Sequence, residues 1–334
     1  MPTRAAADIF RCPQCRASLT VDLAAEIRCA ACGVLVDAAD GVIDLVPASK
    51  RGREREFYDR YYESSSAGTA VPDPVELPHV WIGTNAPWEM ERVWRRLGDL
   101  KGRTVLLLGN GESTAELYML TRRPRALVFS DLSPVGLRTF ARGVNGAPPD
   151  GLVLAAMDAL DLPLRDGSVD VVYGFAFVHH LPDLDRFLGE VARVLRPGGR
   201  CVFIDDAHSP AWQRLKLGWL RPLMRWSHRH AARSPEDLRE TWSGGFRESQ
   251  LAAAVHRAGG EPWFERVALL YYIWMRAAGV LLPAGVRRFG AHRLIARGCR
   301  RIDELLLHSA WGRRNMVRLI WGFSKPDQPA RQGA

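Results

Sequence analysis

The stretch VLLLGNGESTAELY, residues 105–118, decides the fold. Its apolar run is typical of a buried parallel strand, which stops at Gly109-Asn110-Gly111, and the residues after this turn predict a helix. In α/β proteins a nucleotide commonly binds where a strand ends in a glycine turn. Glycine lets the backbone come close to the ligand there, and the following helix offers free amides.

The turn argues against two common kinds of nucleotide site. A dinucleotide fold uses a third glycine in GxGxxG, and Thr114 stands at that position. The Gly-Lys-Ser/Thr of an ATP-binding P-loop is also absent. A ligand without phosphates needs only a close backbone approach and amides that meet a carboxylate. The turn therefore favours a ligand of that kind.

Acidic residues end the next two predicted strands. Residues 126–131 read as a second strand that ends in Asp131, whose carboxylate can accept both hydroxyls of a ribose. Residues 152–160 read as a third strand, and its Asp158 suits the exocyclic amine of an adenine. A fourth and a fifth strand are predicted at residues 168–174 and 200–205. The pattern predicts a nucleoside-containing ligand along one edge of a parallel sheet.

Taken together, the segments LLLGNGES, VFSDLSP, MDALDLPLRDGSVDVVYGFAFVHHLPD and EVARVLRPGGRCVFID resemble the class I S-adenosylmethionine-dependent methyltransferases. The likeness is to the broad group that contains quinone-biosynthesis and other small-molecule enzymes, and it covers about residues 104–206. It implies an α/β fold with a doubly wound seven-stranded sheet in the order 3-2-1-4-5-7-6. The last strand, expected at residues 316–323, would be antiparallel.

The resemblance also implies a role for each residue of the cofactor site. The glycine turn would pass beneath the methionine part of S-adenosylmethionine, and Asp131 would hold the ribose. Ser113 replaces the final glycine of the usual GxGxG turn and is small enough to fit. The implied cofactor-binding residues are Gly109, Asn110, Gly111, Asp131, Leu132 on the adenine, Asp158 and Ala159 at the adenine edge, and Phe175 at the reaction centre.

Methyl transfer is an in-line displacement for which alignment of the acceptor can suffice, and a general base helps when the acceptor is a hydroxyl or a carbon acid. The candidate bases are His179 and His180 after the fourth strand, and Asp205 with Asp206 after the fifth. Ligands of open α/β sheets bind at these strand ends. The structural alternatives are a capping histidine pair and loop-anchoring aspartates.

Four cysteines near the N-terminus form two CxxC pairs, and two such knuckles can complete a tetrahedral site for structural zinc. A disulfide framework is less favoured because nothing marks a secreted protein, and a redox pair would need only one CxxC. The segment around them resembles the short zinc ribbon of the tRNA-methyltransferase activator family. The predicted zinc ligands are Cys12, Cys15, Cys29 and Cys32.

We divide the chain into a zinc ribbon at residues 1–48, a helical linker that covers the cofactor mouth at 49–100, and the methyltransferase domain at 101–334, which carries a helical lid insertion at 207–262. Linker helices are expected at 53–63 and 88–100, where Tyr58, Tyr61 and Tyr62 either line the cofactor mouth or pack. The apolar stretch from Val267 reads as a core strand followed by a helix.

The formal charge of +9 is concentrated in one third of the chain. Residues 1–206 hold 24 basic and 28 acidic residues, whereas residues 207–334 hold 22 and 9. The basic third leaves RNA, an acidic lipid headgroup or a phosphorylated substrate open as a partner, and a general arginine bias of the chain is the alternative explanation. The basic, aromatic stretch 211–233 fits an edge helix, a lid over a hydrophobic acceptor, or a peripheral membrane contact.

No transmembrane segment is predicted, because Arg276 interrupts the longest apolar stretch, and no signal peptide precedes it. We therefore expect a cytoplasmic S-adenosylmethionine-dependent methyltransferase that acts on a small, hydrophobic metabolite. Three alternatives remain open: an rRNA or tRNA base methyltransferase, a cofactor-binding protein without methyl-transfer activity, and a non-enzymatic partner protein.

Overall fold

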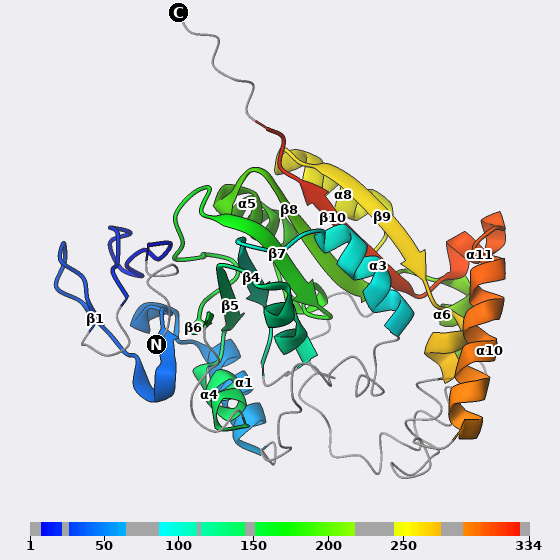
Figure 1. Ribbon diagram of the computed structural model, residues 1–334, viewed down its shortest axis with the longest axis horizontal. Helices are drawn as coiled ribbons and strands as arrows, with labels where there is room; N and C mark the ends of the chain where they lie inside the picture. Colours follow the sequence, from blue (N-terminus) through cyan, green and yellow to red (C-terminus); the bar gives the residue numbers. More distant parts are fainter. Residues whose placement is uncertain are drawn as a thin grey trace, which may run out of the picture.

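A computed structural model describes residues 8–21, 27–64, 87–111, 115–143, 151–217, 244–274 and 290–327. Within these residues an eight-stranded sheet in the order β3-β6-β5-β4-β7-β8-β10-β9 carries helices on both faces (Figure 1). Its strands are β3 (Val42–Asp44), β4 (Thr104–Leu108), β5 (Ala126–Asp131), β6 (Leu152–Ala156), β7 (Val169–Phe175), β8 (Leu195–Asp206), β9 (Glu261–Val267) and β10 (Arg318–Ser324). A two-stranded sheet joins β1 (Ile27–Arg28) to β2 (Leu35–Val36).

The predicted strand order is confirmed from β6 to β9, with β10 antiparallel to both of its neighbours. One strand was not expected: β3 pairs parallel with β6 and extends the sheet by one position. These three residues were expected in the ribbon because they follow the cysteines directly. Their partner strand lies more than a hundred residues further along the chain, so no local pattern reveals the pairing.

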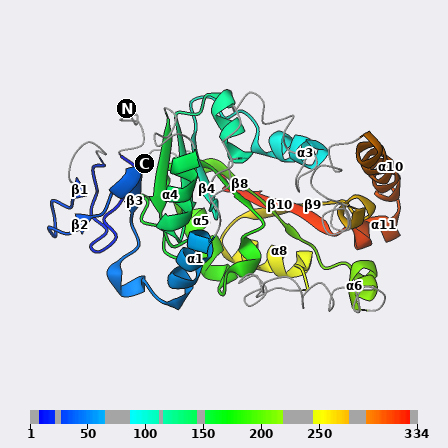
Figure 2. The ribbon, with the colours of Figure 1, turned by 90° about the horizontal axis from the view of Figure 1, so that it is seen from below.

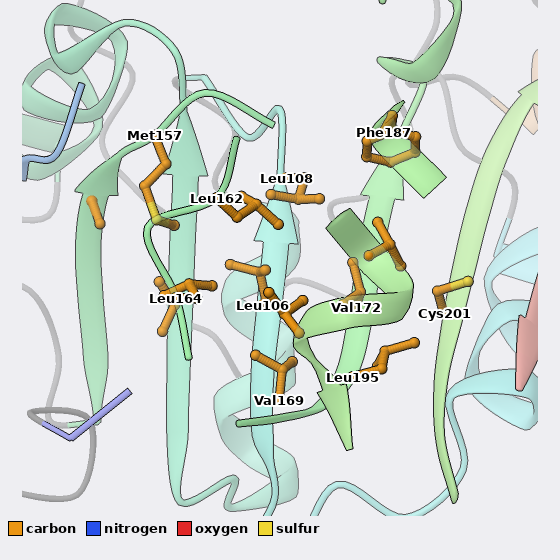
Figure 3. Close-up of a cluster of buried hydrophobic side chains, with 14 of the residues drawn as sticks. Leu106, Leu108, Met157, Leu162, Leu164, Val169, Val172, Phe187, Leu195 and Cys201 are labelled. Atoms are coloured by element: carbon orange, nitrogen blue, oxygen red, sulfur yellow. The ribbon is translucent and has the colours of Figure 1, made fainter. Parts of the chain in front are cut away.

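Alternating side chains of the parallel strands build a separate core on each face of the sheet. Leu106 and Leu108 of β4 belong to one cluster, part of which Figure 3 shows, whereas Val105 and Leu107 belong to the other. Such strands are buried on both faces, which is why they read as continuous apolar runs.

Figure 2 shows the helices around the sheet from a second direction. The helices are α1 (Arg53–Ser64), α3 (Pro87–Leu97), η4 (Ala115–Arg122), α4 (Pro134–Gly143), η5 (Val178–His180), α5 (Leu184–Val194), α6 (Pro210–Leu217), α8 (Glu248–Arg257), α10 (Gly290–Leu306) and α11 (Ala310–Asn315), with short turns η2 (Ala39–Gly41) and η3 (Ala48–Lys50).

Three expectations need correction. The strand expected from Val267 onward lies before it, as β9, whose side chains are mostly half-buried and partly charged. No apolar run marks β9 in the sequence, because a half-buried strand needs few apolar side chains. The third strand ends at Ala156, so Asp158 lies in the following turn. The helix after the glycine turn is the 3-10 helix η4.

The cysteine-bearing segment, by which we mean the described part of residues 1–48, packs directly on the domain that contains the large sheet. Phe10 forms a β-bridge with Leu164, and the amide of Arg165 donates to the carbonyl of Ile9 over 2.8 Å. Ile9 and Phe10 are buried in the same cluster as Leu106. The segment therefore shares a core with the domain that carries the glycine turn.

The predicted lid is described only at its two ends. Within it α8 packs against α5 and β9, so this helix covers the sheet. Residues 218–243, which include most of the basic aromatic stretch, lie outside the described residues, as do Ser113 and residues 275–289. Among the residues that the structure describes, no helix is long and apolar enough to cross a membrane.

Candidate functional site

The turn after β4 requires glycine at two positions. Gly109 and Gly111 adopt φ angles of +68° and +53°, in the left-handed region that glycine favours. A Cβ on Gly109 would lie 2.5 Å from the ring of Phe177, and one on Gly111 would lie 2.9 Å from Cζ of Tyr62. The ring of Phe177, which precedes η5, and the ring of Tyr62 of α1 therefore both pack against the turn.

We expect Gly109→Ala to destabilise the protein more than Gly102→Ala does. Gly102 has the same φ of +68°, but a Cβ added there would meet no atom within 4 Å, so it isolates the backbone effect. The free energy of unfolding should fall by about 1 kcal/mol for Gly102→Ala and by about 2–4 kcal/mol for Gly109→Ala, because overpacking adds to the backbone strain. Denaturant titration of both variants measures the difference. Equal losses would show that Phe177 yields without cost.

The carboxylate of Asp131 stands at the tip of β5, facing this turn. Its Oδ2 accepts a hydrogen bond from the Gly111 amide and its Oδ1 one from the Ser133 amide, both 2.9 Å long. Burial raises the pKa of Asp131 to about 6, against the lowering effect of these amides, and the nearby charge of Asp59 raises it further. Each oxygen accepts one amide and retains capacity for a further donor. The group can therefore bind a diol while the turn keeps its shape.

Helix α1 covers the start of α4 beside this carboxylate. The hydroxyl of Ser133 donates to Asp59 over 2.5 Å, and the ring of Tyr62 lies against Gly111 and Gly136. Tyr61 packs edge-on against Tyr62, while Tyr58 contacts Phe57. The ring of Tyr62 thus lies at the glycine turn.

The loop after β6 brings the second predicted acid to the same edge. Oδ1 of Asp158 accepts the amide of Leu160 over 2.8 Å, which shapes a tight turn that also contains Ala159. Lys50 lies 3.9 Å from Oδ2 of Asp158 and also pairs with Asp161. Leu132 follows Asp131 and is partly buried. At the end of β7, the centre of the Phe175 ring lies 5.2 Å from the Arg318 guanidinium.

The structure joins two of the predicted catalytic residues into a hydrogen-bonded pair. Nδ1 of His179 lies 3.0 Å from Oδ1 of Asp205, whose other oxygen accepts the indole N–H of Trp321 over 3.2 Å. Asp205 is completely buried. An acceptor at Nδ1 places the ring proton there, which leaves Nε2 of His179 as the basic nitrogen.

The other two candidates have different surroundings. Burial, and then the neighbouring His179, lower the pKa of His180 to about 4, so this ring is neutral near pH 7. Asp206 accepts hydrogen bonds from Arg318 over 2.7 Å and from the Tyr272 hydroxyl over 3.0 Å. Arg318, Tyr272 and Trp321 were not predicted from the sequence, since they reach the site only through the pairing of β8 and β10 and the segment after β9.

The four N-terminal cysteines converge as predicted. All four Sγ atoms lie within 4.8 Å of one another, with 3.6 Å between Cys12 and Cys32 and between Cys15 and Cys29. A tetrahedral zinc with Zn–S bonds of about 2.3 Å places its sulfurs about 3.8 Å apart, so the cluster fits this metal. Four thiolates on one zinc ion would leave no position open for a substrate, as in closed structural sites.

Comparison with known proteins identifies relatives. A methyltransferase domain family matches residues 106–203. The demethylmenaquinone methyltransferase of Thermobifida fusca is 32% identical over 182 residues, which cover 51% of this chain and 75% of that enzyme. The fatty-acid O-methyltransferase of Mycolicibacterium smegmatis is 38% identical over 120 residues, which cover 35% of this chain and 43% of that enzyme.

Solved structures share the fold. The geranyl diphosphate C-methyltransferase of Streptomyces coelicolor superposes with a TM-score of 0.53 at 14% identity, over 84% of this chain and all of that one (100%). A chain from the complex between the Haloferax volcanii Trm112 methyltransferase activator and a methyltransferase gives 0.50 at 17% identity, over 80% and 97%. At these identities the likeness concerns the fold alone.

Proposed function

The chain belongs to the class I S-adenosylmethionine-dependent methyltransferases, and we propose that its acceptor is a small, hydrophobic metabolite that loses a proton to His179. The hydrogen-bonded pair of His179 and Asp205 at the carboxyl ends of β7 and β8 carries this proposal. A base is useful only if the acceptor atom holds a proton, as a hydroxyl or a carbon acid does.

We propose that S-adenosylmethionine lies along the carboxyl edge of β4, β5 and β6. When bound, it supplies an electrophilic methyl group. Asp131 would accept the ribose hydroxyls, Asp158 and Ala159 would meet the adenine edge, and Leu132 would pack on its face. Gly109, Asn110 and Gly111 would pass beside the methionine part, and Phe175 would line the reaction centre. Two observations support this assignment: the closely packed glycine turn and the buried carboxylate beside it.

In the proposed mechanism Nε2 of His179 removes the proton of the acceptor. Asp205 holds the Nδ1–H in place and stabilises the imidazolium that forms, while the Trp321 indole fixes Asp205. His180 stays neutral, because its pKa is about 4, so it adds no repelling charge beside the imidazolium. The two hydrogen bonds of Asp205 support this division of roles.

A hydrophobic acceptor is supported by the names of the relatives. One acts on demethylmenaquinone and another on a fatty acid. In this chain the ring of Phe175 stands at the proposed reaction centre beside Arg318. We also propose that Cys12, Cys15, Cys29 and Cys32 hold a structural zinc ion, which is supported by their spacing in the sequence and the approach of their sulfurs.

To test the acceptor class, the protein is incubated with methyl-tritiated S-adenosylmethionine and either a demethylated naphthoquinone, a long-chain fatty acid or bacterial RNA. We expect label in the organic phase with one of the hydrophobic acceptors and none in RNA. Label in RNA alone would overturn the proposed acceptor while leaving the methyltransferase assignment intact.

His179→Gln should lower kcat about 10²- to 10⁴-fold, the usual contribution of a general base. KM for S-adenosylmethionine should stay about the same, because the proposed role of His179 is to remove a proton from the acceptor. Asp205→Asn should lower kcat as well, since it destabilises the imidazolium. His256→Gln, an exposed histidine on α8, serves as the matched control. Steady-state kinetics with the active acceptor tests this, and an unchanged kcat for His179→Gln would refute a base at this position.

Cofactor affinity should fall as the pH drops through about 6. The pKa of Asp131 is raised to about 6 in the free protein, and ribose hydroxyls donate to the carboxylate, so binding lowers that pKa. The affinity for the cofactor is therefore highest at pH values well above 6. Below pH 6 it declines by at most about tenfold per pH unit. Calorimetric titration with S-adenosylhomocysteine at several pH values measures this. A flat profile would place the ribose elsewhere.

A further inference from the structure

An exposed apolar stripe runs along α10. Leu294 and Leu305 are 70% and 71% exposed, and Ile295 and Ile302 are also exposed. At about 100° of rotation per residue, these four side chains lie within about 100° of the helix circumference, which is the width of a face that normally packs on a core. Trp311 of α11 adds a fifth exposed apolar side chain. We call these five residues the α10–α11 apolar surface.

The opposite face of α10 is what fixes the helix to the domain. Ala296 and Cys299 pack against the sheet's core cluster. The buried carboxylate of Asp303 accepts the amides of Leu269, Leu270 and Tyr271 at 2.9–3.1 Å. The apolar surface is therefore not needed to hold α10 in place.

Cationic side chains border the apolar surface. On a helical projection Arg297 and Arg301 lie next to Leu294, and both are exposed, as are Arg313 and Arg314 beside Trp311. Residues 290–315 contain six arginines and only two acids. Of these acids, Asp303 is buried, while Glu304 pairs with Arg300. The exposed surface is thus both apolar and positively charged.

This surface stands at the same edge of the sheet as the proposed active site. Asp303 holds the segment that follows Val267 at the end of β9. Val267 pairs with Arg318, which in turn pairs with Asp206 at the carboxyl end of β8. In Figure 1, α10 and α11 lie at the outer margin of the molecule, beyond the end of β9 and the start of β10.

We propose that the α10–α11 apolar surface docks on an anionic lipid bilayer. A lipid surface accepts apolar side chains into its acyl boundary and attracts arginines to its headgroups. A second copy of the chain fits less well, because a two-fold interface over this stripe would bring Arg297 and Arg301 of both copies together. The inference extends the proposed function, since a hydrophobic acceptor dissolves in the bilayer on which the enzyme would sit.

Vesicle flotation tests the proposal with the full chain. Wild type should bind vesicles that contain phosphatidylglycerol, less in high salt, and bind weakly to pure phosphatidylcholine. The double variant Leu294→Gln/Leu305→Gln should lose about a hundredfold in partition coefficient. Arg297→Gln/Arg301→Gln should lose about thirtyfold at low salt. Leu35→Gln, which removes a 52% exposed leucine in the cysteine-bearing segment, should bind like wild type.

Three outcomes would overturn the proposal. Wild type could remain unbound, Leu35→Gln could lose as much binding as the α10 variants, or sedimentation velocity could show a dimer that the leucine variant dissociates. The last would make this face an interface between copies. Methyl transfer to a detergent-dissolved acceptor by a protein that does not bind vesicles would reject docking and keep the proposed function. Vesicle binding without any methyl transfer to such acceptors would keep the docking proposal and reject the proposed function.

Discussion

Asp131→Asn is expected to raise the dissociation constant for S-adenosylhomocysteine at least about a hundredfold. A hydrogen bond to a charged group contributes about 1.5–3 kcal/mol, and the proposed ribose contact involves two of them. The amide also replaces one of the two acceptor oxygens that now meet the amides of Gly111 and Ser133. Its NH₂ group would face a backbone donor there, so the glycine turn itself should shift.

Asp170→Asn is a closely matched control for this prediction. Asp170 is as buried as Asp131, at 8% exposed, and it too accepts a backbone amide, that of Thr104, over 2.7 Å. It lies at the start of β7, at the opposite edge of the sheet, where no cofactor is proposed. Calorimetric titration should therefore find its affinity unchanged. A loss of similar size in both variants would indicate general destabilisation and count against a ribose contact at Asp131.

The part of the site formed by local sequence was predictable. Gly109, Asp131 and Asp158 each follow or end a buried strand, and parallel strands deliver their carboxyl ends to one edge whatever the rest of the chain does. The spacing of apolar runs and turns is therefore enough to place these residues together. The same holds for the cysteines, because each CxxC builds half of a metal site by itself.

The polar network around the catalytic candidates was not predictable in this way. His179 is next to Asp205 only because β7 pairs with β8, and Trp321 joins them through the antiparallel pairing of β10. A tryptophan in an apolar strand looks like ordinary core, and nothing in its neighbours marks an indole that donates to a buried carboxylate. Likewise β3 carries only three residues, too few for a periodic signal.

Removal of one cysteine ligand should have the largest effect on the N-terminal segment. We expect Cys29→Ser to lower the zinc content from about one ion per chain to nearly none and to unfold the cysteine-bearing segment, because structural zinc contributes about 10–16 kcal/mol in small modules. Cys299→Ser, which changes a partly buried cysteine on α10, should keep its zinc. Elemental analysis of the purified variants decides between these outcomes, and a full zinc content in Cys29→Ser would exclude the four-thiolate site.

The same variant should also weaken cofactor binding, although no cysteine lies at the glycine turn. Arg16 and Lys50 both pair with Asp161, three residues after Asp158; burial alone would raise the pKa of Asp161, but these two cations lower it. The Arg16 pair and the bridge between Phe10 and Leu164 tie the cysteine-bearing segment to the loop proposed to hold the adenine, and Lys50 of η3 holds the same loop.

Loss of these ties should make the loop after β6 more mobile. Cofactor binding then has to order the loop again, so we expect the affinity for S-adenosylhomocysteine to fall about tenfold. Arg16→Gln, which cuts one tie and leaves all four cysteines in place, should show part of this loss with a full zinc content. If Cys29→Ser lost its zinc but bound S-adenosylhomocysteine as tightly as wild type, the metal would stabilise its own segment only. The ion pair of Arg16 with Asp161 would then have no part in shaping the adenine site.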